Sequence, residues 1–438
     1  MKVQLIQPTT GEYRSNSRSG CYPPLGLISI ATYIRQECPS VKVEILDGEL
    51  ISDDEIIARL DSDIVGLNTN TVTYPQAIKI AAAAKKRGSK VVLGGVYASA
   101  IPDIILSKRA YLIDSLIINQ NHEFNSLPYP DRSLVDLDEY VQIFQQNHPT
   151  WKYRGTSIFT NVGCTWREKS GGGCIFCSRS GARTGKKHPS IIWQEVRELV
   201  ENYRIDYLVD FSDTILQDTG WLQSVIKAKP KDINPSWHIF ARMDEINPET
   251  LKLVKQLPCN HIFVGIESGD PQIYRAARKG GGSPEDSLKA AKLLKDFGIE
   301  LTPSYVIGLP GETEESLKRT YDHACRLKEL TSFEEIFCCQ LIPFPGSRAF
   351  DLLRTKTNID ADILDIEYLK KLWADHFCPI DFELMHEYAH KILGLGKYKI
   401  TIAKNVRRAE IVGSSKEKDA VSIVPCERGG AAEFYSCV

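Results

Sequence analysis

Three cysteines stand close together in the stretch "NVGCTWREKSGGGCIFCSRSG", residues 161–181. Nine residues separate Cys164 from Cys174, and Cys177 follows Cys174 after two more. The stretch is rich in glycine and charge, which is typical of a loop and not of a core, so three unrelated buried thiols do not explain it. Thiolates are ligands of zinc and of iron–sulfur clusters, and the loop therefore predicts a metal centre.

Two kinds of metal centre use three thiols in different ways. A structural zinc site needs four protein ligands, so His188 would have to join the three cysteines, and no second paired metal-binding motif supports it. A [4Fe–4S] cluster held by three thiolates leaves one iron open to a substrate, as catalytic metal sites do. The number three favours the cluster, with zinc as the alternative.

The cysteine loop follows the first strand of an alternating series of strands and helices. Strands are predicted at 156–163, 207–213, 237–243, 261–268, 301–308 and 334–343, and helices at 192–203, 218–227, 248–256, 284–297 and 313–329. Six such units predict an open, partial (β/α)6 TIM barrel and not a closed eight-fold one. The active sites of these barrels lie at the carboxyl ends of the strands, where this chain has polar motifs.

A second alternating series precedes the barrel. Strands are predicted at 2–8, 41–47, 63–69 and 90–96, and helices at 25–37, 52–60 and 74–88. Ser52 and Glu55 have the spacing of a capping box. Short β-rich runs that alternate with helices predict an α/β, doubly wound (Rossmann-like) parallel sheet, in which ligands bind at the carboxyl ends of the strands.

The chain therefore divides into four expected parts. They are an amino-terminal domain at 1–125, a proline-containing linker at 126–150, the barrel at 151–350 and a small, mostly helical carboxyl-terminal region at 351–438. The last residues, 401–438, form either a hairpin or a loose tail.

The barrel motifs occur in the order found in a known superfamily. "NVGC…CIFC" follows the first strand, and "FSDTIL", "FARMDEINPETL", "FVGIESGD", "YVIGLPGETEESL" and "LIPFPGS" accompany the next five. This order resembles the radical S-adenosylmethionine (radical SAM) superfamily over residues 151–350. The pieces "PPLGLISIATYIR", "DIVGLNTNTVTYPQA" and "VVLGGVYASAIP" resemble the cobalamin-binding domain that precedes this barrel in one large subgroup.

The resemblance implies a [4Fe–4S] cluster and S-adenosylmethionine (SAM) as cofactors. Cys164, Cys174 and Cys177 would hold three irons, and SAM would chelate the fourth. An electron from the reduced cluster would cleave SAM to a 5′-deoxyadenosyl radical, which abstracts hydrogen from a natural-product or peptide substrate. The implied partners are that substrate and a reductant such as a flavodoxin or ferredoxin.

The resemblance also carries expected roles onto single residues. The expected SAM contacts are Phe176 and Ile307 at the adenine, Ser212 and Asp213 at the methionine amino group, Arg242 at its carboxylate, and Glu267 and Ser268 at the ribose. The candidates for a hydrogen donor are Cys338, Cys339, Cys259 and Tyr305, for each of which core packing is the simpler interpretation.

Two features depart from the family's pattern. Six extra residues stand between the first two cysteines of the common C-x3-C-x2-C motif, and Trp166, Arg167, Glu168 and Lys169 would lie beside the cluster, unless the insertion is only a tolerated surface loop. In the amino-terminal domain, the D-x-H-x-x-G motif that ligates cobalt and the later "GEGE"-like stretch are absent, and the domain is short. Cobalamin binding therefore stays open.

Two reactions remain open for such an enzyme. One is cobalamin-dependent C-methylation at an unactivated carbon, and the other is a cobalamin-independent rearrangement, epimerisation or excision on a ribosomally made peptide. A non-catalytic iron–sulfur or zinc protein would leave the barrel motifs unexplained. The net charge of −2 gives no electrostatic argument for nucleic acid or an anionic membrane. Without a signal-peptide core or a bilayer-length apolar stretch, the expected location is the cytoplasm.

Overall fold

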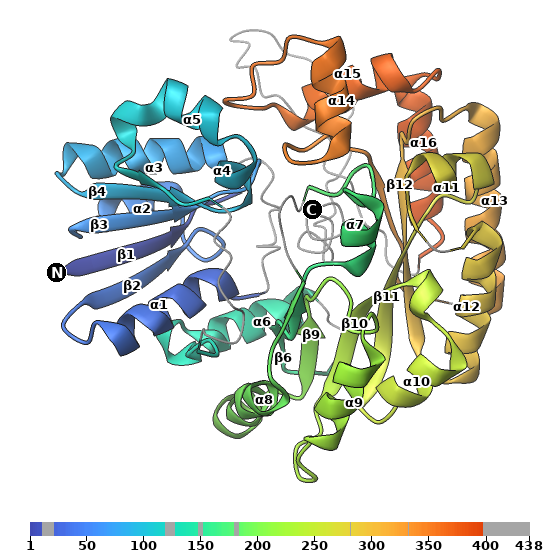
Figure 1. Cartoon of the computed structure of the whole chain (residues 1–438), viewed down its shortest axis with the longest axis horizontal. Coiled ribbons are helices and arrows are strands. Elements are labelled where there is room, and N and C mark those ends of the chain that lie inside the picture. The colour runs from blue at the N-terminus through green and yellow to red at the C-terminus, as the bar shows by residue number, and fades with distance from the viewer. Residues whose placement is uncertain are drawn as a thin grey trace, which may run out of the picture.

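The computed structural model describes residues 1–10, 22–118, 128–147, 152–178, 184–280, 282–331 and 333–396. Two parallel sheets with helices around them lie side by side, and the segment that contains α14 and α15 lies above the space between them (Figure 1). The expected α/β fold class, with a doubly wound domain, a partial barrel and a helical carboxyl-terminal region, is confirmed. The expected hairpin or tail at 401–438 lies outside the described residues.

The amino-terminal domain has a five-stranded sheet of order β2-β1-β3-β4-β5. Its strands are β1 (Lys2–Gln7), β2 (Lys42–Asp47), β3 (Ile64–Asn68), β4 (Lys90–Gly94) and β5 (Ser115–Leu116), and its helices are α1 (Leu25–Glu37), α2 (Asp53–Ala58), α3 (Tyr74–Lys86), α4 (Val96–Ala100) and α5 (Pro102–Arg109). The strand order reverses between β1 and β3, and such a switch point is where doubly wound sheets bind ligands. The predicted cap is present, because the Ser52 hydroxyl accepts a bond from the Glu55 N–H at 3.2 Å.

The barrel has a six-stranded parallel sheet of order β13-β12-β11-β10-β9-β6. Its strands are β6 (Gly155–Ile158), β9 (Tyr207–Asp210), β10 (Ser236–Arg242), β11 (Cys259–Glu267), β12 (Glu300–Ile307) and β13 (Phe337–Gln340). The helices that follow them are α8 (Pro189–Tyr203), α9 (Thr219–Lys227), α10 (Pro248–Val254), α11 (Pro271–Ala276), α12 (Pro284–Asp296) and α13 (Glu314–Thr331). Most strand residues are buried on both faces, as parallel strands between two layers require.

The first barrel strand is shorter than expected. β6 ends at Ile158, and residues Asn161–Val162 form a separate short strand, β7, antiparallel to β8 (Gly185–Lys186). The Ser212 hydroxyl explains the break, because it accepts the backbone N–H groups of Thr160 and Asn161, each at 2.9 Å. The chain therefore leaves the sheet before the cysteine loop begins.

The expected linker contains a helix, α6 (Leu137–Asn147). Its Ile143 and Phe144 side chains pack in one cluster with Tyr207, Val209 and Phe211, on or directly after β9. The segment between the two sheets is therefore also part of the core.

The carboxyl-terminal region covers the last barrel strands and also reaches the amino-terminal domain. It consists of α14 (Arg348–Lys356), α15 (Ile366–Phe377) and α16 (Phe382–Leu393). Trp373 donates its indole N–H to the Gly308 carbonyl at 2.7 Å, which fixes α15 to the end of β12. Between α14 and α15, the Asp362 carboxylate accepts bonds from Tyr74 at 3.1 Å and from Arg109, both in the amino-terminal domain.

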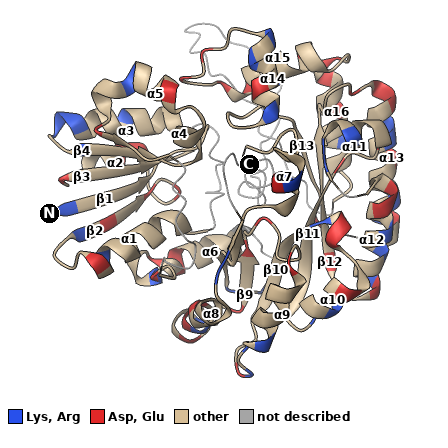
Figure 2. Ribbon diagram, in the orientation of Figure 1, with Lys and Arg blue, Asp and Glu red and all other residues tan. Residues whose placement is uncertain are grey.

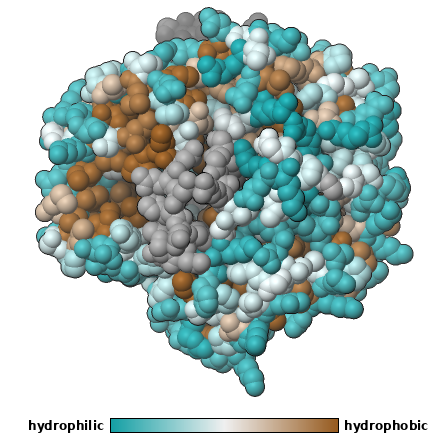
Figure 3. All heavy atoms as spheres, in the orientation of Figure 1, coloured by the Kyte–Doolittle hydropathy of each residue, from teal (hydrophilic) through white to brown (hydrophobic). Residues whose placement is uncertain are grey.

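Figure 2 shows where the charged residues lie along the chain. Acidic and basic residues are interspersed over the outer helices there, in agreement with the net charge of −2. Apolar surface gathers over the amino-terminal domain, at the left of Figure 3. No helix within the described ranges has both the length and the apolar character needed to cross a membrane.

Candidate functional site

The three cysteines lie after β6 and β7, at the carboxyl end of the first barrel strand. Cys164 is the residue before helix α7 (Thr165–Ser170), and a turn closed by the Cys177 N–H and the Cys174 carbonyl at 3.2 Å holds the other two. All three thiols are free and partly buried. Burial raises the pKa of the Cys174 thiol to about 12, the Lys279 ammonium opposes that rise, and the Cys164 and Cys177 thiols add to it. The Cys174 thiol therefore lies close enough to Cys164 and to Cys177 to interact with each electrostatically.

The start of the cysteine loop is held by residues that follow β9. The Gly163 N–H bonds to Asp213 Oδ2 at 2.7 Å, and Gly163 has a φ of 83°, which suits glycine. Gln217 accepts from the Thr165 N–H and donates to the Gly163 carbonyl, both at 2.9 Å. Asp213 and Ser212, two expected SAM contacts, thus both hold the loop in place.

The donor set fits a cluster better than a single metal ion. In the part of the chain that the structure describes, no three His, Cys, Asp or Glu side chains converge as ligands of one ion. His188, the fourth ligand of the zinc alternative, instead caps α8 through Ser190. In a [4Fe–4S] cluster each thiolate binds a different iron, so the sulfurs need not converge. Lys279 and Arg167 add positive charge beside thiols that would be anionic as ligands.

The insertion between the first two cysteines forms the helix α7. The helix is followed by Gly171, Gly172 and Gly173, with φ values of 64°, 137° and 74°, which only glycine adopts readily in succession. These glycines turn the chain back so that Cys174 can approach Cys164. Of the four residues expected beside the cysteines, Arg167 contacts Cys177, whereas Glu168 and Lys169 are exposed. The hydrogen bonds of Trp166 and Glu168 to other segments show that α7 is not a loose surface loop.

Trp166 anchors α7 to the barrel. Its indole N–H donates to the Arg278 carbonyl at 3.0 Å, and its ring lies 5.2 Å from the Arg242 guanidinium carbon. A Cβ on Gly280 would come within 2.2 Å of the indole, so the backbone and the ring are in close contact. The insertion therefore lies over the carboxyl end of β10 and the segment that follows α11.

Arg242 is nearly buried, with 8% of its surface exposed. Its Nε and Nη2 atoms bond to the two carboxylate oxygens of Asp244 at 2.9 and 2.7 Å. Its Nε also lies 3.7 Å from Glu245 Oε1, and its planar face packs against the Trp166 ring. Asp244 is a partner that the sequence pattern did not reveal.

Glu267 carries backbone strain at the end of β11. Its φ is 67°, a left-handed value that is costly for a residue with a side chain, and the β11–β12 register shifts between Gly265 and Glu267. Its Oε1 atom accepts from Lys279 at 2.5 Å, and both side chains are nearly buried. Lys279, which also faces Cys174, was missed in the sequence, although it begins a glycine-rich run that could have marked it.

The other expected SAM contacts are buried. Ser268 is fully buried and shares a hydrogen bond with Thr320 of α13 at 3.1 Å. Ile307 is also fully buried, and Phe176 is 8% exposed within the main core. All three residues are thus packed in the interior of the barrel domain.

The hydrogen-donor candidates fall on different sides of the sheet. The Tyr305 hydroxyl shares a hydrogen bond with His323 of α13 at 2.9 Å, so it lies between the sheet and the outer helices. Cys338 pairs with Tyr305 in the register and takes the same side. Cys259 is buried at the amino end of β11, the end opposite the cysteine loop. Only Cys339 lies on the concave side, where it packs beside Val72 of the amino-terminal domain.

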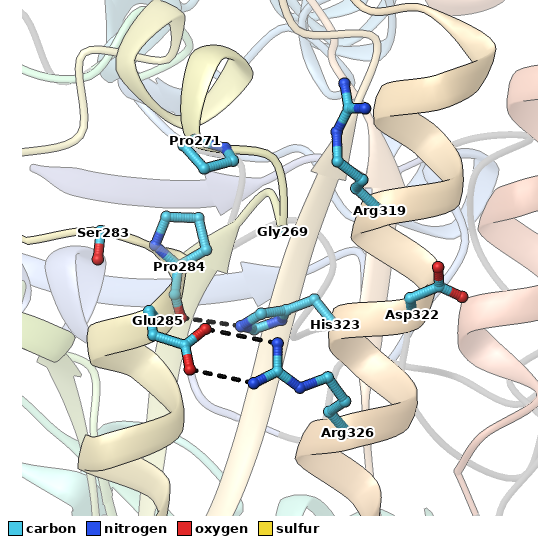
Figure 4. Close-up of a pocket in the computed structure, with 9 residues that line it drawn as sticks. All are labelled: Gly269, Pro271, Ser283, Pro284, Glu285, Arg319, Asp322, His323 and Arg326. Carbon is cyan, nitrogen blue, oxygen red and sulfur yellow. Dashed lines mark hydrogen bonds and ion pairs between the residues drawn. The ribbon is translucent and has the colours of Figure 1, made fainter.

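An outer cavity of 260 Å³ lies beside Tyr305's partner His323 (Figure 4). It is lined by residues of the β11–α11 loop, α12 and α13, and its arginines are paired, Arg326 with Glu285 at 3.0 Å and Arg319 with Asp270. It contains no residue of the cysteine loop and is a separate feature of the helix layer.

A smaller cavity of 110 Å³ lies between the two domains. It is lined by Gln7 and Asn68, at the ends of β1 and β3, by the segment 22–27, and by Ser157, Phe159 and Phe211 of the barrel. Gln7 and Asn68 bond to each other at 2.7 Å across the switch point. The carboxyl ends of the two sheets therefore meet at this cavity.

Comparisons with known proteins agree with the division into an amino-terminal domain and a barrel. Residues 158–324 match the model of the radical SAM superfamily, and residues 15–124 match that of the B12 binding domain. An uncharacterized methyltransferase of Pyrococcus horikoshii is 26% identical over 80% of this chain and 83% of that protein. Bacteriochlorophyllide d C-8(2)-methyltransferase of Chlorobaculum tepidum is 24% identical over 83% of this chain and 81% of that protein.

Solved structures share the fold. The radical SAM methyltransferase TsrM of Kitasatospora setae, with tryptophan and a SAM analog bound, has a TM-score of 0.60 and 17% identity, over 81% of this chain and 76% of that one. The cobalamin-dependent SAM radical enzyme OxsB has a TM-score of 0.59 and 16% identity, over 91% of this chain and 58% of that one. With the barrel, the cysteine loop and both matched families, the chain is a radical SAM superfamily enzyme with an amino-terminal cobalamin-binding-like domain.

Proposed function

We propose that this protein is a cobalamin-dependent radical SAM methyltransferase that methylates a carbon of a natural-product or peptide substrate. The observation that carries the proposal is the cavity at the β1–β3 switch point, because it opens between the ligand-binding edge of the amino-terminal sheet and the first strand of the barrel. A cofactor held at that edge would lie next to a substrate held in the barrel.

The edge of the amino-terminal sheet suits a large, flat, partly apolar cofactor. Val96, Ile117 and Ile118 follow β4 and β5 and are 44% to 46% exposed, so large apolar side chains face solvent at this edge. Gly95 has a φ of 99°, and a Cβ there would lie 2.4 Å from the Thr69 carbonyl. A bulkier residue would therefore deform this edge.

No histidine stands in residues 41–70, so the cobalt would bind without a protein histidine from that segment. Asp47, the last residue of β2, accepts a hydrogen bond from Tyr140 of α6 at 2.5 Å. Relatives named as methyltransferases, and solved relatives with cobalamin bound, support the cofactor in this arrangement.

The radical SAM domain would use the cluster on Cys164, Cys174 and Cys177, which supplies the electron for the chemistry of SAM. The protein's own residues position the reactants. Lys279 and Arg167 offset the negative charge of the thiolates, and Trp166 of α7 packs on Arg242 at the end of β10. Enzymes of this superfamily need a reductant and a substrate, and we propose a flavodoxin or ferredoxin as the reductant.

One observation favours a second candidate function. Cys339 lies on the concave side of the barrel, where a thiol could return a hydrogen atom to a substrate radical. This would suit a cobalamin-independent epimerisation, rearrangement or excision on a ribosomally made peptide.

Cobalamin retention separates the two functions. After anaerobic cluster reconstitution, the full chain is mixed with hydroxocobalamin and desalted, and the cobalt-bound absorbance is measured. We expect retention by the wild type and by Ile30→Arg, whose side chain is 46% exposed on α1, and loss in Ile118→Arg, which is 46% exposed at the sheet edge. Absence of retained cobalamin in the wild type would contradict the methyltransferase and leave the Cys339 alternative.

A further inference from the structure

Arg167, on the insertion helix α7, lies beside the sulfur of Cys177. Arg167 Nη1 lies 3.1 Å from Cys177 Sγ and 3.4 Å from the Cys177 carbonyl oxygen. Both contacts are made by the same guanidinium nitrogen and both are with Cys177, so this nitrogen points toward Cys177. A loop of the common family length would lack the residues that carry this guanidinium.

Arg167 is held in this position by its surroundings. The Gly171 and Gly172 N–H groups both bond to the Arg167 carbonyl, that of Gly172 at 3.1 Å. An ideal Cβ on Gly173 would meet the Arg167 Cβ and Cγ atoms at 3.3 Å, so the arginine stem already fills the space beside the glycine turn. The side chain therefore has little freedom to swing away from Cys177.

The helix that carries Arg167 is itself fixed. Besides the Trp166 contacts, Arg278 Nη2 donates to the Ser170 carbonyl at 3.1 Å at the other end of α7. Glu168 accepts from the Thr184 N–H at 2.9 Å on the side of β8. A helix tied on two sides is a positioning element and not a passive insertion.

We propose that Arg167 is a tuning residue that makes the cluster easier to reduce, by donating a hydrogen bond to the sulfur of Cys177. Reduction adds one electron, taken from the external reductant, to a cluster whose thiolates are already anionic. A hydrogen-bond donor with a full positive charge stabilises the reduced form more than the oxidised form, and hydrogen bonds to the sulfurs are among the factors that set cluster potentials.

This inference rests on the cluster assignment within the proposed function, but not on cobalamin or on methyl transfer. It can therefore be tested without SAM, cobalamin or substrate. The readout is the reduction potential of the cluster, which a purely structural role of α7 would leave unchanged.

The test is a redox titration, monitored by electron paramagnetic resonance (EPR), of the anaerobically reconstituted full chain. Arg167→Gln should make the cluster about tenfold harder to reduce, a shift of about 59 mV to more negative potential for one electron. Arg167→Lys keeps the positive charge but lacks the planar guanidinium group. Its reduction potential should therefore lie between those of Arg167→Gln and the wild type. Lys169→Gln removes the same charge from an exposed position of the same helix and should match the wild type.

Two results of the titration would overturn the proposal: a wild-type potential in Arg167→Gln, or an equal shift in Lys169→Gln, which would indicate a general charge effect. Pulsed EPR on wild-type protein containing isotope-labelled arginine nitrogen provides a test that needs no variant. A coupling between the reduced cluster and an arginine nitrogen is expected, and its absence would overturn the proposal even if Arg167→Gln failed to assemble a cluster.

Discussion

The indole of Trp166 and the guanidinium of Arg242 face each other, with 5.2 Å between the guanidinium carbon and the ring centroid. This contact joins an insertion in the cysteine loop to the end of the third barrel strand, β10. It places the residue expected to bind the SAM carboxylate under an aromatic ring that only the insertion supplies. The insertion and the expected SAM site are therefore parts of one structure.

Trp166→Ala should weaken SAM binding about tenfold. The change removes a cation–π contact and a hydrogen bond to the Arg278 carbonyl, together about 1–2 kcal/mol. Anaerobic equilibrium dialysis of SAM against the reconstituted protein measures the effect. Trp221→Ala is the matched control, because that indole bonds to the Lys187 carbonyl at 2.9 Å on the outer helix α9. Equal SAM affinity in the two variants would argue against a role of Trp166 in the site.

Ionisation of the buried Glu312 carboxyl should lower the stability of the folded protein as the pH rises toward neutrality. Burial raises the pKa of its carboxyl to about 7, against the opposing N–H groups of Gly308 and Leu309. The folded protein thus holds a proton that the unfolded chain releases near pH 4.5, so stability falls between about pH 4.5 and pH 7 and is level above.

Glu312→Gln keeps an acceptor for the Gly308 N–H but does not titrate. Thermal unfolding of both proteins is measured between about pH 5 and pH 8. The unfolding temperature should fall with rising pH in the wild type and should fall less in the variant. Parallel curves would mean that Glu312 does not titrate in this range.

Asp362→Asn should loosen the carboxyl-terminal region from the amino-terminal domain. The carboxylate is 9% exposed and bonds to Arg109 Nε and to Tyr74, both at 3.1 Å, so its loss leaves Arg109 without its partner at a local cost of about 3 kcal/mol. Hydrogen–deuterium exchange should accelerate about 100-fold across 359–364. The control is Asp360→Asn, whose carboxylate is 65% exposed and pairs with Lys108. Similar exchange in both variants would show that the Asp362 contact does not hold the segment.

The positions of the strands could be predicted from the sequence more readily than the directions of their side chains. β1 to β4 follow apolar, β-branched runs between polar turns, and the structure places them within two residues of the predicted bounds. β12 is buried on both faces, so no apolar–polar alternation indicates that Tyr305 faces the outer helices. For the same reason nothing in the pattern indicates that Cys339, on the next strand, faces the concave side of the sheet.

The parts of the site that were missed depend on tertiary contacts. The proline residues in 126–150 predicted a linker. In the structure, however, the apolar side chains of α6 pack in the hydrophobic cluster that contains Phe211. Lys279 lies twelve residues after Glu267 and is brought to it by the turn of α11, which no local spacing reveals. The three cysteines, in contrast, were predicted from one loop, because their spacing is local.

A cluster with three protein ligands and one open iron requires Cys164 to belong to the same ligand set as Cys174 and Cys177. The measurement is EPR of the reduced, anaerobically reconstituted protein with and without SAM. In the wild type and in Cys38→Ala, which changes an exposed cysteine at the end of α1, SAM should alter the cluster spectrum, because one iron is open. Cys164→Ala should lose the cluster or its response to SAM. A Cys164→Ala protein with the wild-type spectrum and the wild-type response to SAM would contradict the account.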